Sequence, residues 1–450
     1  MRHKAEKDRS QHSQKSKQRP QGKEVSALLT ALALLALSAP TSAESSPVYS
    51  STTPVTLQEC FQRAHKISET VGISAENTRL VQQEYRAQIG SVLPHIDWIK
   101  SQFYQQNQVD GATGLAASSL QPTQPLSYFQ LYQPIFAGFR DWETIAITKS
   151  QEVQARLNEQ ATDLQLLTDV ATAFYAAYTL QDQLSVLTET RKLNQDQVDQ
   201  LDRWVNIGRS RPSDLLSAQT QLASVDAQIE DTRRTWAESR HLLLFLAGVP
   251  ADVPLTDQEP LPPGLTLEEA ITRAGKRPDI LSAVESLHQA ELNIRFQRGG
   301  HLPTLGLTAH SYTERIGFYS TVRWDATFLL DVPLYEGGST QAQVRQARSQ
   351  EIIAQLTLAR LTRDVDRQVR TAYEDLQHAV SEVQAYDKAV QLAEKNYGVQ
   401  EKENRLGVTT NLELLQLLTN MQNIRGQALI SRATARLDDI LLRVAMGEGL

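Results

Sequence analysis

The segment 139–207 contains neither glycine nor proline, the two residues that most often interrupt a helix. At 1.5 Å per residue, a continuous helix of this length would run roughly 100 Å. Helices in globular proteins average only about 11–12 residues. The segment therefore predicts a helix far longer than those of an ordinary globular domain.

Apolar and small residues recur along this part of the chain at alternating steps of four and three, which is the spacing of a coiled-coil seam. We expect two helical hairpins, over 139–247 and 339–446, that turn near Gly208 and Gly407. The many alanines in the seam indicate helices that approach closely. The clearest seam positions are Leu166, Val170, Ala173, Ala177, Leu180, Leu184 and Leu187 in the first hairpin, and Val365, Val369, Ala372, Leu376, Ala379, Val383, Tyr386, Val390, Ala393 and Tyr397 in the second.

The sequence contains the same plan twice. The segment 134–138 (PIFAG) reappears at 333–337 (PLYEG), and from there the offset stays at 199 residues. An offset that holds over more than 110 residues is hard to obtain by chance. We expect a first repeat over 44–248, a Pro-rich linker over 249–264 and a second repeat over 265–447.

Each repeat is predicted to contain the same elements in the same order. A short helix and a helix of some twenty residues come first, two strands follow, and the long hairpin ends the repeat. The expected ranges are about 56–66, 71–91 and 95–133 before the first hairpin, and about 266–274, 278–298 and 303–332 before the second.

The strand segments alternate between apolar and polar residues, most clearly over 320–332. A membrane-spanning strand needs about 9–11 residues with one lipid face and one polar face. A half-buried hairpin of a soluble protein is the alternative interpretation, but aromatic residues near the strand ends favour a barrel. The expected lipid face holds Val322, Trp324, Phe328 and Leu330, and the expected lumen face holds Thr321, Arg323, Asp325 and Thr327.

Four strands are too few to close a barrel, which needs about eight, and a spanning sheet cannot leave open edges in lipid. Several chains would therefore have to share one barrel.

The N-terminus is predicted to be an export signal. A basic region over 1–24 is followed by a short apolar run and by small residues before position 44. This order is typical of a secretory signal peptide, so we expect residues 1–43 to be removed. The single cysteine, Cys60, lies within an expected apolar helix face and cannot form an internal disulfide.

Charge and motifs exclude several function classes. The net charge of −7 argues against a generally basic nucleic-acid binder, and the mean hydropathy of −0.38 argues against a multi-helix membrane protein. No phosphate-binding glycine loop, zinc-binding HExxH or nucleophile-elbow motif occurs. We therefore expect no enzymatic activity, no cofactor and no metal site.

At this point the chain resembles the TolC family of outer-membrane export ducts over about 50–447. The resemblance rests on the duplicated plan, on the β-to-α joints Pro134…Gly138 and Pro333…Gly337, and on the two hairpin tips. The tips read VNIGRSRPSDLL from 205 and NRLGVTTNLELL from 404. They are similar to the family's aromatic-x-x-Gly-x₅-Asp-hydrophobic tips.

The resemblance implies a mainly α fold with a small membrane β part. Duplicated coiled-coil α-hairpins would form an α-barrel, and four strands per chain would contribute to a shared twelve-stranded trimeric β-barrel. It implies a homotrimer in the lipid of a Gram-negative outer membrane. It also implies a periplasmic adaptor (membrane fusion) protein and an inner-membrane pump of the RND or ABC type as partners. The chain would then be the channel-tunnel component of a tripartite efflux or type I secretion system.

The resemblance also places a gate at the tips. Its constriction carboxylate falls on Glu413, and a second family position falls on the neutral Gln416 one turn later; Asp214 is the first-hairpin equivalent. The family's tip aromatic would fall on Val205 and Asn404, so a Tyr–Asp latch is not expected. The residues expected at the tips and in adaptor contact are Gly208, Arg209, Arg211, Arg405 and Gly407.

Two other classes remain as alternatives. A soluble periplasmic coiled-coil adaptor or scaffold would share the long hairpins but would not need the alternating strands. A helical surface-binding or adhesive protein would lack a twofold repeat with matched tips.

Overall fold

The computed structural model describes residues 54–106, 123–257, 264–317, 319–406 and 408–450. The predicted signal peptide (1–43), part of the predicted linker and the tip glycine Gly407 lie outside the described residues. Within the described ranges, no helix is both long and apolar enough to cross a membrane.

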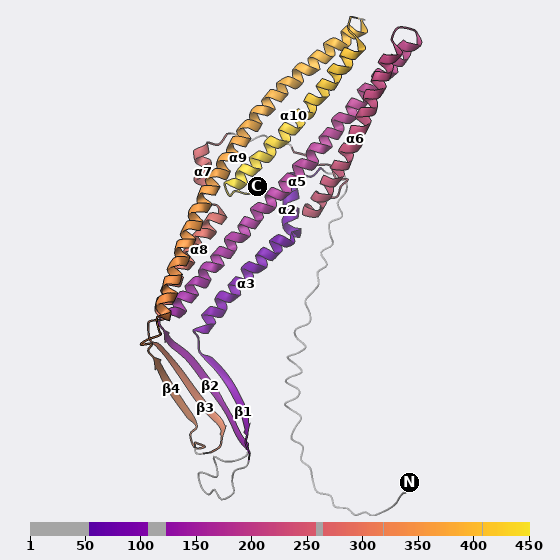
Figure 1. The fold of residues 1–450 in the computed structure, drawn as a ribbon. Coiled ribbons are helices and arrows are strands. Elements are labelled where there is room, and N and C mark those ends of the chain that lie inside the picture. Colours follow the sequence, from indigo (N-terminus) through magenta and orange to yellow (C-terminus); the bar gives the residue numbers. More distant parts are fainter. Residues whose placement is uncertain (1–53, 107–122, 258–263, 318, 407) are drawn as a thin grey trace, which may run out of the picture. The chain divides into compact units, whose positions relative to one another are not determined.

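The two halves of the described chain contain the same elements in the same order (Figure 1). The first half has α2 (Leu57–Ile67), α3 (Glu69–Ser91), β1 (His95–Tyr104), β2 (Thr123–Ala137), α5 (Arg140–Asn206) and α6 (Pro212–Ala247). The second half has α7 (Leu267–Ala274), α8 (Pro278–Gly299), β3 (Thr304–Arg315), β4 (Trp324–Asp331), α9 (Ser339–Arg405) and α10 (Asn411–Ala445).

Local sequence signals explain where the shorter helices begin. At the start of α2, Thr56 and Glu59 form a capping box, in which each side chain accepts a hydrogen bond from the backbone N–H of the other. The same box recurs at the start of α7. Pro212 and Pro278 occupy the first positions of α6 and α8, where the missing N–H of proline costs nothing.

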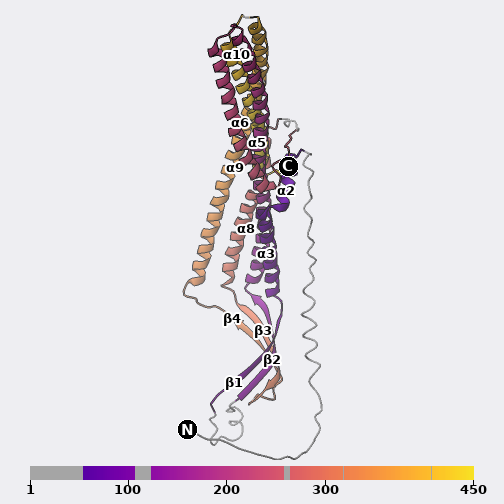
Figure 2. The same cartoon turned by 90° about the vertical axis from the view of Figure 1, so that its right-hand side faces the viewer.

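The long helices form two hairpins. α5 packs against α6 and α9 packs against α10, while α10 also contacts α5 and so joins the hairpins. α3 lies along α5, and α8 contacts both α5 and α9 (Figure 2). α5 and α9 are each 67 residues long. The predicted pair of long helical hairpins is confirmed.

The largest buried cluster lies where α2 meets the middle of α5 and the end of α6. Phe174 and Leu243 are fully buried there, beside the small side chains of Ala171 and Ala177. Small residues let the helix backbones approach closely. Cys60 is fully buried in the same cluster, and burial raises the pKa of its thiol to about 12.

The strands form one antiparallel sheet in the order β1-β2-β3-β4. The central β2–β3 pair joins the two halves of the chain. On one face, Phe328 lies opposite Leu307 and Leu330 opposite Leu305; on the other face, Thr327 lies opposite Thr308. The sheet therefore has the apolar and polar faces that the alternation predicted.

The apolar–polar alternation over 320–332 extends beyond the strand that the structure contains. β4 covers only Trp324–Asp331, so the expected face residues Thr321, Val322 and Arg323 lie in the connection from β3. Gly317 takes a φ of +93° in this connection, and the Val322 N–H donates to the Tyr319 carbonyl (3.0 Å). These turn hydrogen bonds occupy the backbone that a longer strand would need.

Candidate functional site

The first hairpin turns sharply between α5 and α6. Gly208 takes a φ of +74°, in the left-handed region that favours glycine. The N–H groups of Arg209 and Ser210 both donate to the Trp204 carbonyl, at 2.8 and 3.2 Å. The Arg209 guanidinium lies 5.2 Å from the centre of the Trp204 ring. Arg209 therefore rests on an aromatic side chain at the tip.

Asp214 accepts hydrogen bonds within the same turn. The Ser210 hydroxyl donates to Oδ2 of Asp214 (3.2 Å). Nε of Arg211 lies 4.0 Å from Oδ1 of Asp214, and the Arg211 side chain is 83% exposed. An exposed ion pair contributes at most about 1 kcal/mol, so the hydroxyl gives the more defined contact.

The second hairpin reaches the first through side-chain amides. Nδ2 of the buried Asn404 donates to Oδ1 of Asn411 (3.1 Å) and to the Thr409 carbonyl (3.2 Å). Nδ2 of Asn411 then donates to the Ser210 hydroxyl (3.3 Å), which in turn donates to Asp214. A chain of hydrogen bonds thus runs from Asn404 in the second hairpin to a carboxylate in the first.

Glu413 takes no part in this series of hydrogen bonds and lies at the exposed start of α10. It forms a capping box with Thr410: the Thr410 N–H donates to the Glu413 carboxylate (3.0 Å), and the Glu413 N–H donates to the Thr410 hydroxyl (3.3 Å). These bonds, the backbone one first, hold the pKa of Glu413 below its ordinary value of 4.5. Arg405 is paired with Glu401 on its own helix.

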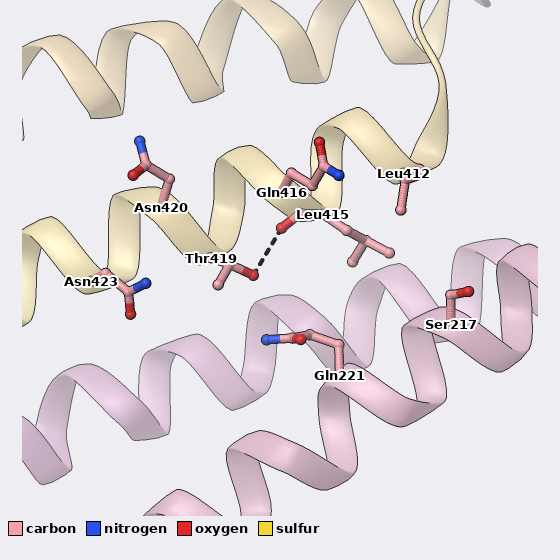
Figure 3. A pocket seen from close by; sticks show the side chains of 8 residues that line it. All are labelled: Ser217, Gln221, Leu412, Leu415, Gln416, Thr419, Asn420 and Asn423. Atoms are coloured by element: carbon pink, nitrogen blue, oxygen red, sulfur yellow. Dashed lines mark hydrogen bonds between the residues drawn. The ribbon is translucent and has the colours of Figure 1, made fainter.

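A groove opens between α6 and α10 beside the tips, and Figure 3 shows the side chains that line it. Gln416, the expected second gate position, lies in this groove, whereas Glu413 does not line it. None of the lining side chains is charged. Leu415 is almost fully buried and packs against Leu201 and Ala218 of the first hairpin. The lining residues are Ser217, Gln221, Leu412, Leu415, Gln416, Thr419, Asn420 and Asn423.

The β-to-α joints use two successive left-handed residues. Gly138 and Phe139 take φ of 65° and 64° before α5, and the second joint uses Gly337 and Gly338 at 62° and 84°. A side chain at Gly138 would collide with the Gly299 carbonyl oxygen. Of the two expected joint prolines, Pro134 lies at a register irregularity of β2, and Pro333 follows β4.

Within the part of the chain that the structure describes, no group of three or more His, Cys, Asp or Glu side chains could hold a metal ion.

Comparison with known proteins identifies the family and the fold. The sequence profile of the outer membrane efflux protein family matches residues 70–249 and 273–448. The chain is 24% identical to the outer membrane protein TolC of Escherichia coli over 340 residues, covering 71% of this chain and 68% of TolC. It is 25% identical to the alkaline protease secretion protein AprF of Pseudomonas aeruginosa over 328 residues, covering 69% and 67%.

Solved structures show the same fold. The outer membrane protein VceC of Vibrio cholerae superposes with a TM-score of 0.73 at 16% identity, covering 87% of this chain and 96% of that one.

The chain is therefore an outer-membrane channel component, and it belongs to the outer membrane efflux protein family. The resemblance and the outer-membrane location inferred from the sequence are confirmed. The channel is favoured over the soluble adaptor, because the relatives are outer-membrane proteins.

Proposed function

We propose that three copies of this chain assemble into one duct. Their sheets would form a twelve-stranded barrel in the outer membrane, and their hairpins would form a helical tunnel in the periplasm. The observation that carries the proposal is a four-stranded sheet with one apolar face and two edge strands, β1 and β4. Edge strands need partners in lipid, and neighbouring copies would supply them.

The hairpin tips would form the periplasmic gate, with Glu413 as its acidic ring. Glu413 is exposed, whereas its first-hairpin equivalent Asp214 accepts a hydrogen bond from Ser210. Three copies of one carboxylate in a narrow passage attract cations and raise the barrier for anions. Gln416 is neutral, so we propose a single acidic ring. The ring carries selectivity, and no residue is assigned a catalytic step.

The tips and the groove between α6 and α10 would contact a periplasmic adaptor, a membrane fusion protein. The adaptor would link the duct to an inner-membrane pump of the RND or ABC type, in a tripartite efflux or type I secretion system. Amides, hydroxyls and Leu412 (59% exposed) line the groove, and such a surface suits a helical partner. The arginines at the tips, Arg209, Arg211 and Arg405, would lie at the edge of this contact.

We also propose that residues 1–43 direct export and are removed. The mature chain would then consist of the repeats 44–248 and 265–447, joined by 249–264. N-terminal sequencing of the protein purified from the membrane tests the cleavage site.

The function itself is tested by reconstitution in a planar lipid bilayer. The purified protein should produce discrete, cation-preferring conductance steps when added at low concentration. A preparation that inserts but never conducts, even after the tip link is removed by Asn411→Ala, would contradict the duct.

A further inference from the structure

The two halves of the chain correspond residue by residue. α9 begins and ends 199 residues after α5, and α8 begins 209 residues after α3. We call two residues counterparts when they are related by these offsets. Counterparts can be compared directly, because they lie at equal places in equal elements.

The surroundings of α3 and its counterpart α8 differ in one respect. α8 packs extensively against both α5 and α9, whereas the extensive helix packing of α3 is with α5. The α3–α5 contact corresponds to the α8–α9 contact. One side of α3 is equivalent to the side of α8 that faces α5, and no long helix of the same chain packs against it. Because α9 is the counterpart of α5, α9 is the helix expected on that side.

The α5–α8 seam inside the chain is polar. Nε2 of Gln289 donates to Oε1 of Gln154 (2.9 Å), and Nε2 of Gln154 donates to the Ser282 carbonyl (3.4 Å). A second contact lies one turn away, where the Ser150 hydroxyl donates to the Glu285 carboxylate (2.6 Å).

Three counterparts of this seam are exposed aliphatic residues, whereas Ser150 and Glu285 correspond to the polar residues Ser349 and Glu76. Gln154 corresponds to Ile353, Gln289 to Leu80 and Ser282 to Ile73. In the single chain Ile353, Leu80 and Ile73 are 62%, 54% and 63% exposed. Single exposed apolar residues are ordinary, but these three occupy the positions that make the seam in the other half.

An ion pair farther along the hairpins shows the same correspondence. Arg425 of α10 lies 3.4 Å from Glu189 of α5. Their counterparts are Asp226 of α6 and Lys388 of α9, so the two charges are exchanged. Lys388 is exposed in the single chain, and a second copy placed by the same rule brings Asp226 opposite it.

We propose that neighbouring copies join through α9 of one and α3 of the next, with Ile353 packed between Ile73 and Leu80. Lys388 of the first copy faces Asp226 of the second. The occupant of the open side of α3 is thus a second copy of this chain. This proposal rests on the assembly of several copies that the proposed function requires, and it adds the residues of the joint.

The chemical difference between the two seams has a physical consequence. A glutamine buried against leucine leaves its amide without a hydrogen-bond partner, which costs about 1–3 kcal/mol. The glutamine contact inside the chain and the aliphatic contact between chains therefore pair poorly with each other. This mismatch directs α5 to α8 of the same chain and α9 to α3 of a neighbouring copy during assembly.

Cross-linking tests the joint in full-length protein extracted from the membrane. Cysteines are placed at Leu80 and Ile353 in a Cys60→Ala background and treated with a short bismaleimide. Covalent dimers and trimers are expected on a denaturing gel. The matched control pairs Leu80→Cys with Gln355→Cys, which lies two residues on and about 200° around the helix, and it should remain monomeric.

A second measurement uses rescue. Ile353→Gln should lower the temperature at which the assembled copies dissociate. Adding Leu80→Gln should restore much of the loss, because the pair then copies Gln154 and Gln289. Copies that assemble as a trimer without the Leu80–Ile353 cross-link would overturn this joint while leaving the proposed duct intact. A protein that never assembles would overturn both, and purely additive effects of the two glutamines would overturn the contact.

Discussion

The side-chain amide of Asn411 donates a hydrogen bond to the hydroxyl of Ser210, 3.3 Å away, and thereby links the tips of the two hairpins. The buried Asn404 orients Asn411 by donating a hydrogen bond to its side-chain oxygen, and the Asp214 carboxylate accepts a hydrogen bond from the Ser210 hydroxyl. A hydrogen bond between neutral groups contributes only about 0.5–1.5 kcal/mol. Such a link can hold a tip closed and still yield when a partner binds.

Removing this link should favour the open tip. Asn411→Ala deletes about 1 kcal/mol of contact per copy, so the open fraction of single channels in a planar bilayer should rise several-fold. Ser210→Ala should act in the same direction, and the double variant should show less than the sum of the two effects. Asn423→Ala, an amide change on the same helix farther from the tip, serves as the control. Equal effects of Asn411→Ala and Asn423→Ala would show that the link does not hold the gate.

Neutralising the exposed tip carboxylate should reduce selectivity more than conductance. Glu413→Gln removes one charge per copy from the proposed ring, so the cation preference should fall while helix packing still sets the aperture. The reversal potential under a salt gradient measures this preference. Asp214→Asn is the matched comparison. A reversal potential that Glu413→Gln leaves unchanged and Asp214→Asn shifts would place the ring on the first hairpin.

The same carboxylate fixes the pH dependence of selectivity. The Thr410 backbone and hydroxyl bonds lower the pKa of Glu413 below 4.5, so they oppose protonation of the proposed ring as the pH falls. The cap contribution to stability is complete well above 4.5, declines as the pH falls from 4.5 toward the lowered pKa, and is gone below it. Cation preference should therefore persist from neutral pH into the acidic range and fall only as Glu413 becomes protonated. Thr410→Ala should move the loss of cation preference to a higher pH. A loss that already occurs at about pH 6 would instead point to a histidine.

The sheet should tolerate charge on one face only. Phe328→Arg places a cation on the apolar face and should cost about 2–4 kcal/mol if it lies near mid-bilayer. Thr327→Arg, the adjacent residue on the polar face, should be tolerated. Folding into lipid vesicles, followed by denaturant titration, measures both. Equal costs would mean that the two faces have been assigned wrongly or that the sheet is not in lipid.

The first β-to-α joint should depend on glycine at position 138. Gly138→Ala forces a side chain into a left-handed conformation, which costs about 1–2 kcal/mol, and against the Gly299 carbonyl. The thermal midpoint should therefore fall. Gly337→Ala carries the same conformational cost but meets open space, so it should be milder. A smaller effect at Gly138 than at Gly337 would contradict the close approach.

The long elements could be predicted from sequence because their signals are local and repeated. The absence of glycine and proline over 139–207 and the four-three spacing of apolar residues were enough to anticipate α5. The constant offset between the repeats then predicts a second helix of the same length, which is α9. The start of β4 could not be read from alternation, since Val322 fits the pattern but its N–H is used in a turn.

The side-chain contacts at the hairpin tips could be identified only from the structure. By sequence, the family's aromatic residue falls on Val205, whereas in the structure Trp204, one residue earlier, lies beneath Arg209. Asn404 stands where the family has an aromatic residue, and its amide supports the link between the hairpins. The bond between Asn411 and Ser210 joins side chains about 200 residues apart in sequence, and no local pattern encodes it. The left-handed Phe139 likewise has no sequence signal, because aromatic residues rarely adopt that conformation.

The central claim is that several copies of this chain form one outer-membrane duct, and the subunit number of the extracted protein tests it most directly. The protein is extracted from outer membranes with a mild detergent, and the mass of the intact particle is measured by native mass spectrometry. The account predicts three chains per particle and no protein in the fraction released without detergent. A monomer in that water-soluble fraction would contradict it.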